Sequence, residues 1–337
     1  MTRVLEVANL RVSFPGAGRS RFYPVDGVSF SLERGEMLAL VGESGCGKSL
    51  TSLALLQLIP PPGRIESGSV IRLGETDVLA LKGEALRRIR GRRIGMIFQD
   101  PMTSLNPVFT VGAQIVEGIR AHFKMPSAEA RQKALQLLQE VGIPDPVERL
   151  KAYPHQLSGG MRQRVMIAIA LAAEPEILVA DEPTTALDVT VQAQILEVLD
   201  SLRARRGMAV LLITHDLGIV AGRADRVAVM YAGQIVEEAT TSRLFANPSH
   251  PYTQGLFASV PRITGPLKRL NPIRGSVPAP AAWPTGCRFR PRCPQAFDRS
   301  EIEPPLIPVE PEHRMRCWLA EEGRGTGDRG PGTRAPV

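Results

Sequence analysis

The residues with the clearest chemical meaning form a glycine-rich loop at positions 42–49, which reads Gly-Glu-Ser-Gly-Cys-Gly-Lys-Ser. Gly42, Gly45 and Gly47 allow the backbone N–H groups of such a loop to curl around phosphate oxygens, with Ser44 in the same cradle. A helix that begins at the end of the loop adds a favourable dipole for an anion. The loop therefore predicts a nucleotide-phosphate site.

Two side chains at the end of the loop and two acidic residues much later in the chain suggest the chemistry of that site. Lys48 is expected to reach the β- and γ-phosphates, and the Ser49 hydroxyl to bind Mg²⁺. The apolar strand 177–180 ends in Asp181 and Glu182. Asp181 is interpreted as the outer-shell Mg²⁺ ligand and Glu182 as the base that polarises an attacking water, although strand-end carboxylates can also be mere helix caps.

The elements that must position these groups follow from apolar patterning. Residues 37–41 form a continuous apolar strand that leads into the loop, and 49–58 read as the helix that leaves it. Residues 176–180 and 208–213 are again short apolar strands. They alternate with a helical stretch at 191–202, which predicts a parallel sheet.

The rest of the chain shows other periods. Residues 4–14 and 25–32 alternate apolar and polar side chains, as half-buried strands do. A β-rich stretch with turn glycines is expected to about residue 99, mostly helical structure over 111–171, and a hairpin from 227 that turns at residues 232–233.

Bulk properties narrow the setting of the protein. The chain has 337 residues and a formal charge of +7. It contains no apolar run near the roughly 18–20 residues that span a bilayer and no signal peptide, so we expect a cytosolic protein. The arginine-rich run 87–93 lacks interleaved aromatic residues and is interpreted as a solvated surface rather than a nucleic-acid site.

A third motif lies between the two halves of the nucleotide site. Residues 157–164 read Leu-Ser-Gly-Gly-Met-Arg-Gln-Arg, which resembles the signature of the ABC ATPases. The resemblance implies ATP hydrolysis on an α/β phosphate-loop core with an antiparallel β-subdomain and a helical subdomain. It also implies a dimer, in which Ser158 and Gly160 point at the γ-phosphate bound by the other subunit. The alternative is that Ser158 simply caps a helix.

The same resemblance assigns the remaining residues of the ATP site. Gln99 looks like the Q-loop residue that touches Mg²⁺ and water, and His215 like the switch histidine on the γ-phosphate. Asp188 matches the D-loop. Phe14 stands where an aromatic residue stacks on adenine, with Tyr23 as a competitor and a core position as the alternative for Phe14.

Longer runs resemble one branch of the family, the ATPases of dipeptide and oligopeptide importers. These runs are 99–107, 180–190 and His250-Pro251-Tyr252-Thr253, which opens a carboxy-terminal extension. The resemblance implies two membrane permease subunits, a second ATPase (identical or homologous) and an extracytoplasmic peptide-binding protein as partners, and a location on the cytoplasmic face of the membrane. Nickel importers are close relatives and leave a nickel or other small-solute importer as an alternative.

Composition and resemblance together suggest three parts of the chain. Residues 1–245 are expected to form the nucleotide-binding domain, with the helical subdomain at about 100–170. Residues 246–320 are expected to form the extension, where proline is frequent, and 321–337 a disordered tail of glycine, arginine and proline.

Three cysteines of the extension raise a separate question. Cys287, Cys293 and Cys317 cluster near the end of the chain. The resemblance implies an extension with four cysteines and a 4Fe–4S cluster, but Ser300 stands where one cysteine is expected. An iron–sulfur site on three thiolates, a zinc site completed by His313, and three unligated thiols all remain open.

Two other classes of protein are rivals. A soluble ABC ATPase that remodels DNA or ribosomes would carry a long coiled coil or two ATPase domains, and neither is apparent. A non-hydrolysing interaction module is disfavoured because Lys48, Glu182 and His215 are all present.

Overall fold

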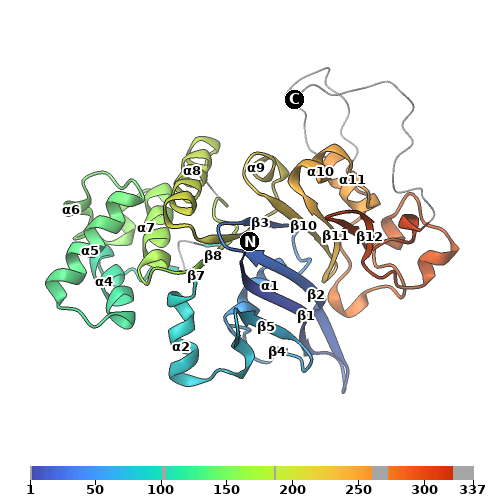
Figure 1. Ribbon diagram of the computed structural model, residues 1–337, viewed down its shortest axis with the longest axis horizontal. Helices are drawn as coiled ribbons and strands as arrows, with labels where there is room; N and C mark the ends of the chain where they lie inside the picture. The colour runs from blue at the N-terminus through green and yellow to red at the C-terminus, as the bar shows by residue number, and fades with distance from the viewer. Residues whose placement is uncertain (1, 101–103, 186, 260–271, 322–337) are drawn as a thin grey trace.

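The central feature of the protein is an eight-stranded sheet (Figure 1). The structure is a computed structural model that describes residues 2–100, 104–185, 187–259 and 272–321. Its strand order is β12-β13-β11-β10-β3-β9-β8-β7. The strands that pair in parallel are β3 (Met37–Val41), β7 (Ile94–Ile97), β8 (Ile177–Asp181), β9 (Ala209–Thr214) and β10 (Arg226–Tyr231). Because these strands run the same way, the loops at their carboxyl ends meet at one edge of the sheet.

Burial explains why three of these strands are continuous apolar runs. Every residue of β3, β8 and β9 is buried. A parallel strand covered on both faces has no solvent side on which a polar residue would be favoured. The expected parallel sheet is confirmed.

A smaller antiparallel sheet covers one side of the core. Its strands are β1 (Arg3–Pro15), β2 (Arg21–Glu33), β4 (Arg64–Ile65), β5 (Val70–Leu73) and β6 (Thr76–Asp77). Helix α1 (Lys48–Leu55) contacts strands of both sheets. The alternating burial along β1 and β2 matches the alternation expected over residues 4–14 and 25–32.

The helices of the middle of the chain extend away from the sheet, on the side opposite the carboxy-terminal extension (Figure 1). They are α4 (Val111–His122), α5 (Ser127–Glu140), α6 (Pro146–Arg149) and α7 (Gly159–Leu171). Helix α7 contacts β7 and α8 (Val189–Arg206), so it joins this helical arm to the core. Among the described residues, no helix has both the length and the apolar character needed to cross a membrane.

One helix was not expected. The stretch before residue 99 was predicted to be β-rich, but α2 (Gly83–Arg92) lies within it. Only Ile89 of this helix is buried, and Arg87 and Arg88 pair with Glu84 on its surface. Only Leu86 and Ile89 pack against the core, and the backbone of Arg90 and Gly91 is not helical, so the regular turns are too few to show a clear apolar period.

The extension continues the large sheet. After the hairpin of β10 and β11 (Gln234–Thr240) come α10 (Thr241–Ala246) and α11 (Pro251–Ala258), then β12 (Ile307–Glu310) and β13 (His313–Met315). Strand β13 pairs with β11 and β12 with β13, both antiparallel. Helical periodicity fades in this part of the sequence, so α11, β12 and β13 are elements that the sequence pattern did not predict. The predicted disordered tail lies, apart from Glu321, outside the described residues.

Candidate active site

The phosphate loop connects β3 to α1 and is closely packed at both ends. A Cβ atom on Gly42 would lie 2.2 Å from the carbonyl oxygen of Met230, and one on Gly47 would lie 2.4 Å from that of Pro24. Gly47 also has φ +108, which L side chains rarely adopt. Glycine is therefore required at both positions for steric reasons.

Lys48 is directed back along the loop. Its Nζ donates hydrogen bonds to the carbonyl oxygens of Gly42 (2.8 Å) and Glu43 (3.1 Å), and the residue is almost fully buried. Ser44 and Gly45 are exposed at the tip of the loop. The burial of Cys46 raises the pKa of its thiol, as suits a small packing residue rather than a nucleophile.

The structure brings Ser49 and Asp181 together. The Ser49 hydroxyl donates to Asp181 Oδ1 at 3.1 Å, and the Ser52 hydroxyl donates to Oδ2 at 3.1 Å. Burial is the largest effect on the carboxyl of Asp181 and raises its pKa. A hydroxyl beside a carboxylate is an oxygen donor set that suits Mg²⁺, which usually takes its other ligands from phosphates and water. Sequence reasoning missed Ser52, because its role depends on the turn of α1 that places it beside β8.

Glu182 is the centre of a second cluster, one residue after Asp181. Its carboxylate accepts hydrogen bonds from Gln99 Nε2 (3.0 Å) and Thr185 Oγ1 (3.0 Å), and His215 Nδ1 lies 3.4 Å from its other oxygen. The Glu182 side chain is 12% exposed and that of His215 is 61% exposed. Three strand-end segments thus place predicted residues around one carboxylate. Thr185 was not singled out from the sequence, although it lies in a run that was.

The backbone of Glu182 is also fixed. Its φ is +46, an uncommon value for a residue other than glycine. Its N–H donates to the carbonyl oxygen of Ile213 in β9 at 2.9 Å. This bond holds the carboxylate at the edge of the sheet where β8 and β9 end.

Ser158 and Asp188 each cap a helix. The Ser158 hydroxyl accepts from the Met161 N–H at 3.3 Å at the start of α7, and Asp188 Oδ1 accepts from the Val191 N–H at 2.9 Å at the start of α8. A Cβ on Gly160 would lie 2.6 Å from Val191 Cγ1, so glycine permits the close approach of α7 to α8. Both caps are exposed.

Phe14 lies in β1 and is half-buried. Its ring stacks on that of Phe22, with centroids 5.9 Å apart, and packs against the core beneath the antiparallel sheet. These contacts fit a packing role and leave stacking on adenine as a prediction.

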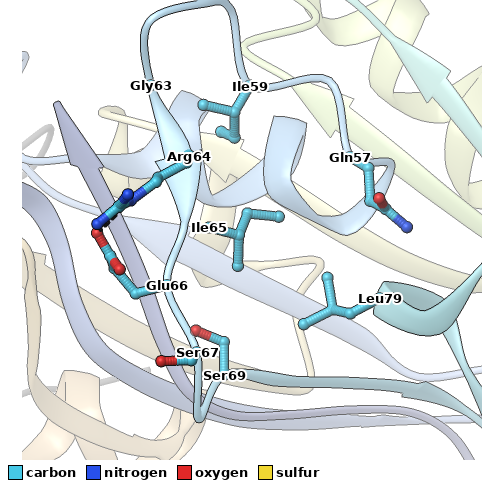
Figure 2. A pocket seen from close by; sticks show the side chains of 9 residues that line it. All are labelled: Gln57, Ile59, Gly63, Arg64, Ile65, Glu66, Ser67, Ser69 and Leu79. Atoms are coloured by element: carbon cyan, nitrogen blue, oxygen red, sulfur yellow. Dashed lines mark hydrogen bonds and ion pairs between the residues drawn. The ribbon is translucent and has the colours of Figure 1, made fainter.

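A hollow of about 560 Å³ is lined by residues between 57 and 69 and by Leu79 (Figure 2). In Figure 2, Arg64 and Glu66 point toward one another, and their side chains are 2.9 Å apart. None of the predicted site residues lines this hollow. The predicted site residues therefore lie in the side-chain clusters around Asp181 and Glu182 and not in this hollow.

The three cysteines of the extension are free thiols packed among apolar side chains. Burial raises the pKa of Cys287, of Cys293 and of Cys317, the last to about 12. Within the described parts of the chain, no group of three or more His, Cys, Asp or Glu residues could hold a metal ion. The predicted iron–sulfur site is not supported, and neither is its zinc alternative.

Comparison with known proteins agrees with this geometry. Residues 25–185 match the sequence profile of the ABC transporter family, and residues 236–299 match the oligopeptide/dipeptide transporter C-terminal region. The oligopeptide transport ATP-binding protein AppD of Bacillus subtilis is 51% identical, over 96% of this chain and 98% of the relative. This chain belongs to the ABC transporter ATPase family. The dipeptide transport ATP-binding protein DppD of Haemophilus influenzae is 50% identical, over 95% of this chain and 97% of the relative.

Solved structures of ABC proteins share the fold. A dimeric structure of the bacterial ABC transporter cassette MJ0796 aligns with a TM-score of 0.63 and 27% identity, over 70% of this chain and 98% of that one. Another structure of the same cassette is a post-hydrolysis dimer bound to ADP and phosphate. The expected fold class is thus confirmed for this ABC ATPase.

Proposed function

We propose that this ABC ATPase hydrolyses ATP to drive the uptake of dipeptides or oligopeptides through a membrane importer. The observation that carries the proposal is the pair of adjacent clusters at the ends of β8 and β9. Ser49 and Asp181 offer oxygens to Mg²⁺, and Glu182 is surrounded by Gln99 and His215. Identity of about 50% to peptide-transport ATPases over nearly the whole chain supports peptide as the transported solute.

Each side chain has a proposed role in the reaction. Lys48 binds the β- and γ-phosphates after leaving its carbonyl partners, while Ser49 and Asp181 hold Mg²⁺ directly and through water. Bound Mg²⁺ neutralises charge on the phosphates. Glu182 accepts a proton from the attacking water, and its hydrogen bond from Gln99 keeps the carboxylate aimed at the site.

We infer that each ATP lies between two ATPase subunits. The exposed caps Ser158 and Asp188 and the close-packed Gly160 would face the phosphate loop of the second subunit, with His215 on the γ-phosphate and Phe14 beside adenine. The dimeric state of the MJ0796 cassette supports this arrangement.

The partners follow from the same family membership. Two permease subunits and a second ATPase, identical or homologous, would complete the importer, and an extracytoplasmic protein would deliver the peptide. The chain would then lie on the cytoplasmic face of the membrane, held there by the permeases. The match of residues 236–299 to the oligopeptide/dipeptide transporter C-terminal region favours peptide over nickel. The proposed division of the chain is a nucleotide-binding domain at 1–245, an extension at 246–320 and a tail at 321–337.

Uptake by cells that lack this chain tests the substrate. Such cells should fail to accumulate labelled dipeptides or oligopeptides, and the intact gene should restore uptake while a Lys48→Ala variant should not. Labelled nickel, measured in parallel, is the control. Loss of nickel uptake with undiminished peptide uptake would assign the chain to the nickel branch.

A further inference from the structure

The carboxy-terminal extension contacts the phosphate loop at Glu43. The guanidinium of Arg292 donates to both carboxylate oxygens of Glu43, at 2.7 and 2.9 Å. The two residues are 249 positions apart. The Arg292 side chain is only 6% exposed and that of Glu43 is 30% exposed, so this two-pronged pair is partly shielded from water.

Arg292 is itself held in place. Its Nε donates to the carbonyl oxygen of Arg274 at 2.9 Å, and its Nη2 donates to that of Gly275 at 3.2 Å. Its guanidinium also lies 5.7 Å from the ring centre of Tyr231. The pKa of Arg292 is raised, chiefly by its hydrogen bonds with Glu43. A guanidinium fixed by other partners loses little side-chain entropy when it binds a carboxylate.

The backbone of Glu43 is held as well. Its N–H donates to the hydroxyl of Tyr252 in α11 at 2.9 Å, while its carbonyl oxygen accepts from Lys48. Tyr252 is fully buried, and its ring packs against Tyr231 and Phe289, with centroids 4.6 and 5.3 Å away. The carboxylate and the N–H of Glu43 are thus both bound by the extension, and its carbonyl by the lysine that must meet the phosphate.

The extension is firmly attached to the core at other points. Strand β13 pairs with β11, and the buried His313 lies 2.7 Å from the buried Glu237 across these strands. Arg288 pairs with Asp26 of β2 and donates to the carbonyl oxygen of Ala232 at 2.6 Å. Because the extension is fixed to the core at these points, its contacts with Glu43 can restrict the movement of the phosphate loop.

We propose that Arg292 and Tyr252 are positioning residues for ATP binding, through which the extension holds the phosphate loop ready for the nucleotide. A loop already held in one conformation loses less entropy when ATP binds. Release of the loop should therefore weaken ATP binding while leaving the chemical step little changed once the site is saturated. The inference rests on the proposed ATPase site, but not on peptide as the solute.

The test compares two arginines of one short 3-10 helix, Arg290–Arg292. Arg292→Ala should raise the dissociation constant for Mg·ATP, and the KM, about tenfold, with kcat within about twofold. Arg290→Ala is the matched control, because Arg290 pairs with Glu301 (2.9 Å) inside the extension and not with the loop. It should change neither constant by more than about twofold. Binding is measured by titration calorimetry on the full chain, and KM and kcat on the assembled importer.

Milder variants keep the test valid if Arg292→Ala fails to fold. Tyr252→Phe removes only the hydroxyl. Arg292→Lys keeps the positive charge but loses the two-pronged pair and the guanidinium hydrogen bonds to Arg274 and Gly275. Each variant should raise the dissociation constant several-fold. Glu43→Gln combined with Arg292→Ala should be no worse than the more damaging single change, because both act on one contact. Unchanged ATP affinity in these variants, or an equal loss in Arg290→Ala, would overturn the inference alone. A wild-type chain that binds no ATP would instead overturn the ATPase site itself.

Discussion

His250 makes the stability of the extension sensitive to acid. It is 1% exposed, and its Nδ1 accepts from the Tyr252 N–H at 3.0 Å as the cap of α11. Burial lowers its pKa from 6.5 to about 4. Because the unfolded chain binds the proton first as pH falls, the free energy of unfolding is unaffected above pH 6.5 and decreases between 6.5 and about 4. The full loss is about 3 kcal/mol, of which about 2 kcal/mol is lost by pH 5.

Urea titration at pH 7.5 and pH 5 measures this loss. Both tryptophans of the sequence, Trp283 and Trp318, lie in the extension, so their fluorescence reports its unfolding. His250→Asn keeps a side-chain acceptor for the cap but cannot titrate, so it should lose about 2 kcal/mol less than wild type over this pH interval. His155→Asn, at an exposed histidine, should behave as wild type. Equal pH dependence in wild type and His250→Asn would refute the reasoning.

Two further predictions concern the ATP site. Ser158→Arg should block hydrolysis at the phosphate loop of the partner. A dimer of one Ser158→Arg chain and one Lys48→Ala chain should therefore keep one working site, whereas a dimer that carries both changes on one chain should have none. The same ATPase activity in the two dimers would exclude the shared site. Gly47→Ala should destabilise the protein by about 2 kcal/mol or more, because the new Cβ would meet the Pro24 carbonyl oxygen at 2.4 Å. Gly45→Ala, with no atom within 4 Å, should cost only the strain of a positive φ, about 1 kcal/mol, and equal thermal shifts in the two variants would contradict this account.

The parts of the fold and of the site that depend on residues close together in the chain could be predicted from the sequence. The apolar runs at 37–41, 177–180 and 208–213 predicted the central strands because buried parallel strands exclude polar residues. The loop residues Gly42 and Gly47 could be recognised from their spacing to Lys48 and Ser49, and the structure adds that close packing leaves no alternative to glycine there.

Contacts between distant segments could not be predicted in this way. The pair of Arg292 and Glu43 spans 249 positions, and no local period or spacing points to it. Strand β13 has only three residues, and it pairs with β11 and with β12, which are distant or irregular in the sequence pattern. The cysteines show the opposite failure: their clustering and the family resemblance suggested a metal, but the described residues contain no group of three or more His, Cys, Asp or Glu that could hold one.

Glu182→Gln tests the central claim, that this carboxylate activates water for ATP hydrolysis. The variant keeps a side chain of the same shape beside Gln99, Thr185 and His215, and it leaves the pair of Ser49 and Asp181 intact. Phosphate release by the assembled importer, with the same change in the second ATPase, should fall about 10²–10⁴-fold while ATP binds within about threefold of its normal affinity. Phosphate release near the wild-type rate, with ATP bound, would contradict the account.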